Sequence, residues 1–102
     1  MKKPATRQEK QHMSEVAALG CIICRRPAEV HHVAGHGVRA SAFETVPLCP
    51  WHHRNGPAGV AIHSGRRSFE KNFGGERWLL SETLRLLKVE GIEPVRKQLP
   101  RR

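Results

Sequence analysis

The chain has few cysteines, few acidic residues and no long hydrophobic run. Its three cysteines are an odd number, and residues 1–20 hold no apolar run suited to a secretory signal, so we expect no disulfides and a reducing cytosol. No stretch is long and apolar enough to cross a membrane. The chain has room for one domain with a small core, which usually needs added support. In a reducing compartment, a bound metal ion is the natural support.

The shortage of acidic residues leaves the chain strongly basic. Lys and Arg number 18 against 9 Asp and Glu, for a formal net charge of +9. Basic residues gather at both ends, and such arms neutralise phosphates and steer association with nucleic acid. Surface charge that serves solubility is the alternative. We expect a basic N-terminal arm and helix over residues 1–19, a folded domain over 20–91 and a basic tail over 92–102.

Turn-forming residues and apolar periodicity predict an α+β domain. In chain order we expect a helix over 7–19 ended by Gly20, strands over 28–33 and 44–48, a short helix from Pro50 to Arg54, and helices over 66–73 and 76–89. The two strands would pair into an antiparallel hairpin, joined by an excursion of about ten residues around Gly35–Gly37. The last helix would bury a stripe made of Leu79, Leu80, Thr83, Leu84 and Leu87.

Two motifs of identical spacing, Cys21-x2-Cys24 and Cys49-x2-His52, flank the expected hairpin. A two-residue gap lets both side chains of a tight turn reach one ion, and thiolates and imidazoles are the ligands of tetrahedral zinc. We therefore predict a structural zinc ion held by these four residues. His53 and His36 are the alternatives for the fourth ligand, and small buried cysteines without metal are the alternative to the site itself.

Three further histidines, His31, His32 and His53, lie next to these motifs in the sequence. Adjacent residues on a strand point to opposite faces, so His31 and His32 should not serve one metal ion in the same way. One metal ligand and one general base is the economical assignment, because imidazole titrates near neutral pH. The alternative for any single histidine is an ordinary surface or core position.

This succession of motifs resembles the HNH, or ββα-metal, nuclease family, in which a Cys knuckle, a strand ending in a histidine pair and a second knuckle followed by histidine occur in that order. The resemblance implies a zinc-stapled ββα-metal core, similar to a treble clef, with flanking helices. It also implies a catalytic set in which His31 and His53 bind a divalent ion and His32 is the general base. The same comparison leaves His52 for the zinc.

The resemblance is closer still to the C-terminal domain of the phage recombination-enhancement nucleases. It covers about residues 20–87 and is carried by the segments 29–32, 47–54 and 59–65, followed by Phe69 and Glu70. It implies DNA as the substrate and a RecA filament on that DNA as a further partner. That family carries a longer basic arm ahead of the domain than residues 1–20 provide.

Two positions depart from the HNH pattern. Glu44 stands where the family has its middle asparagine, and we expect Glu44 to support His32 by a hydrogen bond in its place, or that role to be absent. A third ligand one helical turn after His53 would fall on Pro57, whose side chain cannot bind a metal ion. We therefore look to His63 as the third ligand, with packing against the 66–73 helix as its alternative.

The family resemblance that these motifs carry implies a metal-dependent DNA endonuclease that hydrolyses phosphodiester bonds, with phage or prophage recombination in a bacterial cytoplasm as its setting by analogy. Magnesium is the expected catalytic ion, although imidazole ligands also suit manganese, nickel or a second zinc. The expected phosphate contacts are Arg54, Arg39, Arg66 and Arg67. The alternatives are a non-catalytic zinc-stapled nucleic-acid-binding module, which needs no surplus histidines, and a protein-interaction zinc domain, which predicts no basic arms. Nothing in the sequence indicates an oligomeric state.

Overall fold

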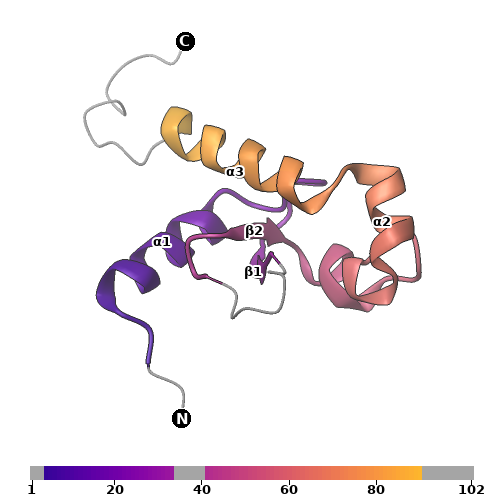
Figure 1. Ribbon diagram of the computed structural model, residues 1–102, viewed down its shortest axis with the longest axis horizontal. Helices are drawn as coiled ribbons and strands as arrows, with labels where there is room; N and C mark the ends of the chain where they lie inside the picture. The colour runs from indigo at the N-terminus through magenta and orange to yellow at the C-terminus, as the bar shows by residue number, and fades with distance from the viewer. Residues whose placement is uncertain (1–3, 34–40, 91–102) are drawn as a thin grey trace.

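The computed structural model describes residues 4–33 and 41–90, and within them it is an α+β structure with a two-stranded sheet (Figure 1). The expected α+β class is thus confirmed. The elements are α1 (Arg7–Ala18), β1 (Glu29–His32), β2 (Thr45–Leu48), η1 (Trp51–Asn55), η2 (Ile62–Ser64), α2 (Arg66–Phe73) and α3 (Glu76–Glu90). Each corresponds to an expected element within a few residues, except η2, a 3-10 turn where no element was expected. Residues 1–3, 34–40 and 91–102, which include Gly35–Gly37 and the expected basic tail, lie outside the described residues.

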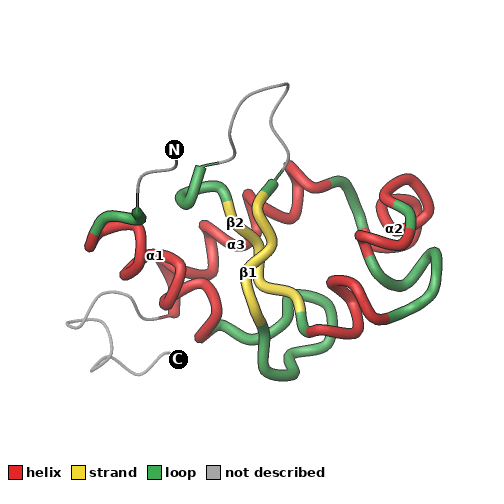
Figure 2. The backbone as a smooth tube through the Cα atoms, turned by 90° about the horizontal axis from the view of Figure 1, so that it is seen from below, coloured by secondary structure: helices red, strands yellow, loops and turns green. Residues whose placement is uncertain are grey.

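The hairpin is the centre of the molecule. β1 and β2 pair antiparallel, with Glu29 opposite Leu48 and His32 opposite Thr45. The first Cys motif joins the same sheet, because the Ile22 N–H donates to the carbonyl of Pro47 at 3.0 Å. Pro47 has no N–H of its own, so only its carbonyl can serve the chain beside it. Figure 2 shows both strands from below, with α1 to the left of the hairpin and α3 passing behind it.

Local signals set the ends of α1. Thr6 and Glu9 form a capping box, in which the Thr6 hydroxyl accepts from the Glu9 N–H and the Glu9 carboxylate accepts from the Thr6 N–H. Gly20, expected to end the helix, has φ of 85°. A side chain there would meet the Arg25 carbonyl oxygen at 2.9 Å, so glycine is required at this position. Val16, on the inner face of the helix, is fully buried.

The core joins the hairpin to the last two helices. Its buried members are Cys21, Val33, Val46, Leu48, Cys49, Ile62, Phe69, Leu79 and Leu80. Thr83 and Leu87 continue the buried face of α3, as expected, but Leu84 is 42% exposed and its expected burial is wrong. At roughly 100° per residue, Leu84 lies about 40° past Leu80 around the helix, outside the arc that the hairpin covers. Among the described helices, none is both long and apolar enough to cross a membrane.

Candidate metal sites and active site

Cys21, Cys24, Cys49 and His52 converge on one point, with their ligand atoms all within 4.8 Å of one another. The sulfurs of Cys24 and Cys49 are 3.7 Å apart, and the Nδ1 atom of His52 lies 3.3 Å from the Cys49 sulfur and 3.8 Å from the Cys21 sulfur. Zinc–sulfur bonds of about 2.3 Å in a tetrahedron place two sulfurs about 3.8 Å apart, so the cluster has the size of a zinc site. It could hold a metal ion, and it contains His52 rather than His53. His36, the other alternative, lies outside the described residues.

Tight turns bring the cysteines to this point. In the first motif, the Ile23 N–H donates to the Cys21 sulfur at 3.4 Å, and Arg25 adopts a φ of 67° as the chain turns back. Burial raises the pKa of the Cys21 thiol. Burial acts in the same direction on Cys49, but hydrogen bonds from the His52 backbone and the neighbouring thiols outweigh it and lower the Cys49 pKa. The local field therefore favours the thiolate, the form that binds metal, at Cys49.

His31, His53 and His63 form a second cluster, whose ligand atoms also lie within 4.8 Å of one another. They come from β1, η1 and η2. Their ring centroids are separated by 5.2 Å from His31 to either partner and by 4.8 Å between His53 and His63. His31 and His53 are buried, at 7% and 5% exposure, and His63 is exposed. The three expected ligands of the catalytic ion are thus brought together, with one edge of the cluster open to solvent.

The element η1, which carries one histidine of each cluster, is a π-helix. Residues Trp51–Asn55 form one turn of π-helix, in which the Gly56 N–H donates to the Trp51 carbonyl at 2.9 Å. Such turns are rare and occur often at functional sites. Here the turn directs two consecutive histidines to different places, His52 to the cysteines and His53 to the other two histidines.

Two carboxylates stand behind the histidine cluster. Nε2 of His31 lies 2.7 Å from Oε2 of Glu76, and Nδ1 of His53 lies 2.6 Å from Oε2 of Glu29. In His31 and in His53, one ring nitrogen is therefore hydrogen-bonded to a carboxylate, and the other nitrogen is available to bind an ion. Metal-binding histidines almost always donate their second nitrogen in this way. The donor chemistry of the cluster thus fits a divalent ion.

Sequence reasoning assigned no role to these two carboxylates. Glu29 had a usable signal, because it lies two residues before His31 and so on the same face of the strand. Glu76 had none, because an acidic residue in the first turn of a helix is ordinary. Its neighbour His31 is 45 positions away in the chain.

The surroundings of His31 and His63 lower the pKa of each ring and so favour its neutral form. Burial lowers the pKa of His31, although the hydrogen bond and the charge of Glu76 act against it. Partial burial lowers the pKa of His63, and the charges of His53 and Arg54 add to that effect. A neutral ring has the lone pair that metal binding requires.

His32 faces the other way and is exposed, as strand alternation predicts. The expected hydrogen bond from Glu44 is not among those of the described residues, and that expectation is corrected. The Glu44 carboxylate instead accepts from Nη1 of Arg77 at 3.3 Å. The backbone explains why: the Val33 N–H donates to the Glu44 carbonyl, so Glu44 pairs with Val33 rather than His32. Paired residues of an antiparallel sheet share a face, and Val33 is on the face opposite to His32.

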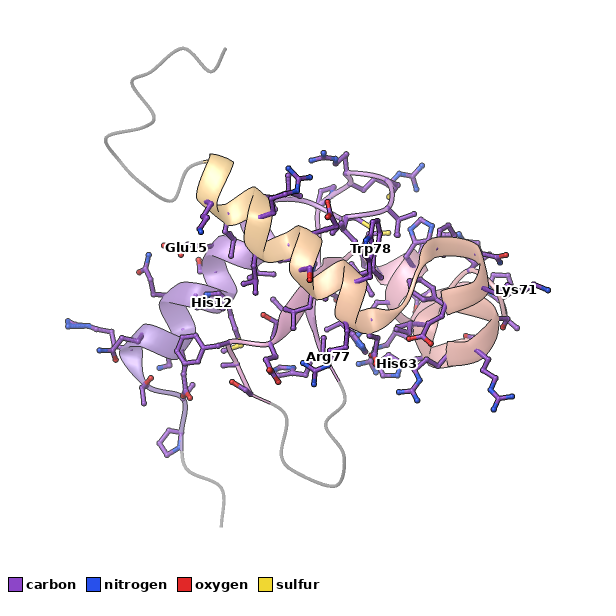
Figure 3. All side chains as sticks on the ribbon, turned by 45° about the horizontal axis from the view of Figure 1, so that its top comes forward. His12, Glu15, His63, Lys71, Arg77 and Trp78 are labelled. Atoms are coloured by element: carbon purple, nitrogen blue, oxygen red, sulfur yellow. The ribbon has the colours of Figure 1, made fainter. Side chains whose placement is uncertain are left out.

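The expected phosphate contacts gather near the histidines only in part. Arg66 donates from Nη1 to Oε1 of Glu76 at 3.3 Å while its side chain stays 57% exposed. Arg54 lies close enough to His63 for its charge to lower the pKa of that ring. Arg67 is exposed on α2. Arg39 lies outside the described residues. In the view of Figure 3, His63 and Arg77 lie below α3, and Trp78 lies above it.

A cleft of about 480 Å³ opens beside the cluster, lined by Glu29, Val30, Pro50, His53, Arg54 and Asn55. It gives solvent access to the carboxylate–histidine pair of Glu29 and His53. An exposed cation at its rim, Arg54, suits an anionic ligand.

A hairpin that carries a Cys₃His cluster and a carboxylate-backed histidine cluster, in a strongly basic chain, defines a small α+β protein with two clusters that could each hold a metal ion. Residues 5–88 match the family model of recombination enhancement, RecA-dependent nucleases. The chain therefore belongs to that family, and its resemblance to the recombination-enhancement nucleases is confirmed. It is thus an enzyme of a nuclease family, which acts on nucleic acid in recombination. No curated protein matches the chain.

Proposed function

We propose that the protein is a metal-dependent DNA endonuclease of the HNH type that hydrolyses phosphodiester bonds. The observation that carries the proposal is the convergence of His31, His53 and His63, two of them backed by carboxylates, next to the exposed His32. The family description supports RecA-bound DNA as the target. A hairpin followed by the short helix η1 agrees with a ββα-metal core.

The two clusters have separate roles in this proposal. Cys21, Cys24, Cys49 and His52 hold a structural zinc at the base of the hairpin. The three histidines hold a catalytic divalent ion, for which magnesium, manganese, nickel and zinc are candidates. When bound, such an ion supplies positive charge beside the scissile phosphate.

The chain's own residues then perform the proton and binding steps. An imidazole nitrogen of His32 takes a proton from a water molecule as the water oxygen attacks phosphorus, and the bond from phosphorus to the leaving oxygen breaks. Its exposure gives His32 access to solvent and to DNA. Arg54, Arg66 and Arg67 bind phosphate oxygens and orient the backbone for attack.

A zinc-stapled binding module that does not cut DNA is the competing function. Such a module needs the Cys₃His cluster and the basic charge, but it has no use for a second cluster of three histidines. The carboxylates on His31 and His53 favour the enzyme, because they are the usual companions of histidines that bind a metal ion.

A plasmid nicking assay tests the proposal. The full chain is incubated with Mg²⁺ or Mn²⁺, with and without RecA filaments, and compared with His32→Ala. We expect the rate to fall by about 10²- to 10⁴-fold, the usual contribution of a general base. His12→Ala is the matched control, because His12 lies on α1 and contacts Phe43 instead of the cluster. Equal cutting by His32→Ala would overturn the base assignment, and no cutting by wild type with any metal would favour the binding module.

A further inference from the structure

Glu76 has a buried carboxylate with two partners, and its backbone N–H makes a third contact. Its side chain is only 8% exposed, and its Oε2 atom lies 2.7 Å from Nε2 of His31. Its other oxygen accepts from Nη1 of Arg66 at 3.3 Å. Its backbone N–H donates to Oε2 of Glu70 at 2.9 Å. Burying a carboxylate is costly unless it is paired and hydrogen-bonded, so these contacts are what allow Glu76 to sit there.

The needs of helix α3 do not explain this arrangement. An acidic residue in a first turn usually serves the helix itself, as Glu9 does in α1 when it accepts from the Thr6 N–H. In α3 the N–H at the start of the helix is satisfied by a residue of α2, because the Glu70 carboxylate accepts from the Glu76 N–H. The Glu76 carboxylate is turned instead toward β1 and its ring partner there.

We propose that Glu76 is a positioning residue that fixes His31 in the Nε2–H form and so presents the lone pair of Nδ1 to the catalytic ion. The inference rests on the proposed function for the purpose of the cluster. A carboxylate can only accept, and a neutral imidazole carries one N–H, so a hydrogen on Nε2 leaves Nδ1 unprotonated. Glu76 acts through His31, because it is not among the residues whose ligand atoms converge.

Loss of Glu76 should weaken metal binding more than loss of Glu29, the carboxylate that pairs with His53. The Glu29 side chain is 45% exposed, so water can replace it as the partner of His53. The Glu76–His31 pair has both side chains at 8% exposure, where water cannot take over either role. Loss of Glu76 therefore leaves a buried ring with no acceptor for its N–H.

The first test measures metal binding rather than cutting. Full-length protein with zinc in its cysteine site is titrated with Co²⁺, whose visible absorption reports binding to the histidines. Replacement of a carboxylate behind a metal-binding histidine typically weakens affinity by about 10- to 100-fold, and we expect that loss for Glu76→Gln. Glu82→Gln, on the same helix and paired with Arg85 at the surface, should bind Co²⁺ as wild type does. Wild-type affinity in Glu76→Gln would overturn the inference.

The second test reads the ring directly, by long-range ¹H–¹⁵N correlation spectra of the zinc-loaded protein without added Co²⁺. We expect wild-type His31 in the Nε2–H form, and a mixture in Glu76→Gln because an amide can either accept or donate. An Nδ1–H form in the wild type would overturn the inference whatever the cutting assay shows. If the wild type holds His31 in the Nε2–H form and binds Co²⁺ but cuts no DNA, the proposed nuclease function is contradicted. The positioning role of Glu76 is then unaffected. Circular dichroism confirms that both variants are folded.

Discussion

At the scale of single residues, His31 and His32 show how far neighbours in a chain can differ. His31 is buried against a carboxylate and its burial lowers its pKa, whereas His32 is exposed on the other face of the strand. Both follow from the alternation of a β-strand, which places one side chain against α3 and the next toward solvent. A ligand and a general base can therefore occupy consecutive positions without competing for one ion.

The arginines near the cluster provide a prediction at this scale. If Arg54 contacts a phosphate, Arg54→Ala should weaken DNA binding and reduce the slope of log affinity against log salt concentration by about one, because one fewer counterion is released. The measurement is a set of DNA-binding isotherms over a range of salt concentrations.

Arg85→Ala is the matched control, since it removes the same charge from the surface of α3, where Arg85 pairs with Glu82. A reduction of the same size in Arg85→Ala would show that total charge, and no particular contact, sets the affinity.

At the scale of elements, the junction between α2 and α3 decides where Glu76 lies. Gly74 has a φ of 109°, and a side chain there would meet the Trp78 ring at 2.9 Å. Gly75 follows directly, and a side chain on it would meet nothing within 4 Å. The turn that aims the start of α3 at the hairpin thus depends on the first glycine and tolerates change at the second.

Replacement of each glycine by alanine should separate these two positions. Gly74→Ala should lower the free energy of unfolding by more than about 1 kcal/mol, because alanine is strained at this φ and overlaps the indole ring. Gly75→Ala should change it by less than about 1 kcal/mol, in either direction. Chemical denaturation of the zinc-loaded protein measures both, and equal effects would contradict this account of the turn.

The elements themselves were largely predictable from local signals. The capping box of α1, the glycine at its end and the apolar stripe of α3 depend on residues within a few positions of one another. The expected burial of Leu84 failed because periodicity gives the centre of a helix face, whereas its edge depends on what packs there.

At the scale of the whole molecule, the Cys₃His cluster adds a further link between segments that the hairpin and the core already bring together. It connects the turn before β1 with the turn after β2, and Cys21 and Cys49 are also part of the core. A core of this size leaves a small margin of stability, to which an ion bound in the cluster would add its binding free energy.

Removal of zinc should therefore unfold the domain. A high-affinity chelator should abolish the cooperative thermal transition seen by circular dichroism, and added Zn²⁺ should restore it, because zinc binding and folding are coupled. His63→Ala, which removes an exposed ligand from the other cluster, should keep a cooperative transition. An unchanged transition in protein shown by metal analysis to be free of zinc would contradict the structural role.

The sequence by itself determined the helices and strands other than η2, the division of cysteines and histidines into two clusters, and the opposite faces of His31 and His32. These properties depend on spacing, and the period of a strand or a tight turn converts spacing directly into geometry. The tertiary structure alone decided that Glu76 backs His31 and that Glu44 pairs with Arg77. Such contacts join residues far apart in the chain, and they depend on how α3 packs across the hairpin, which no local pattern records.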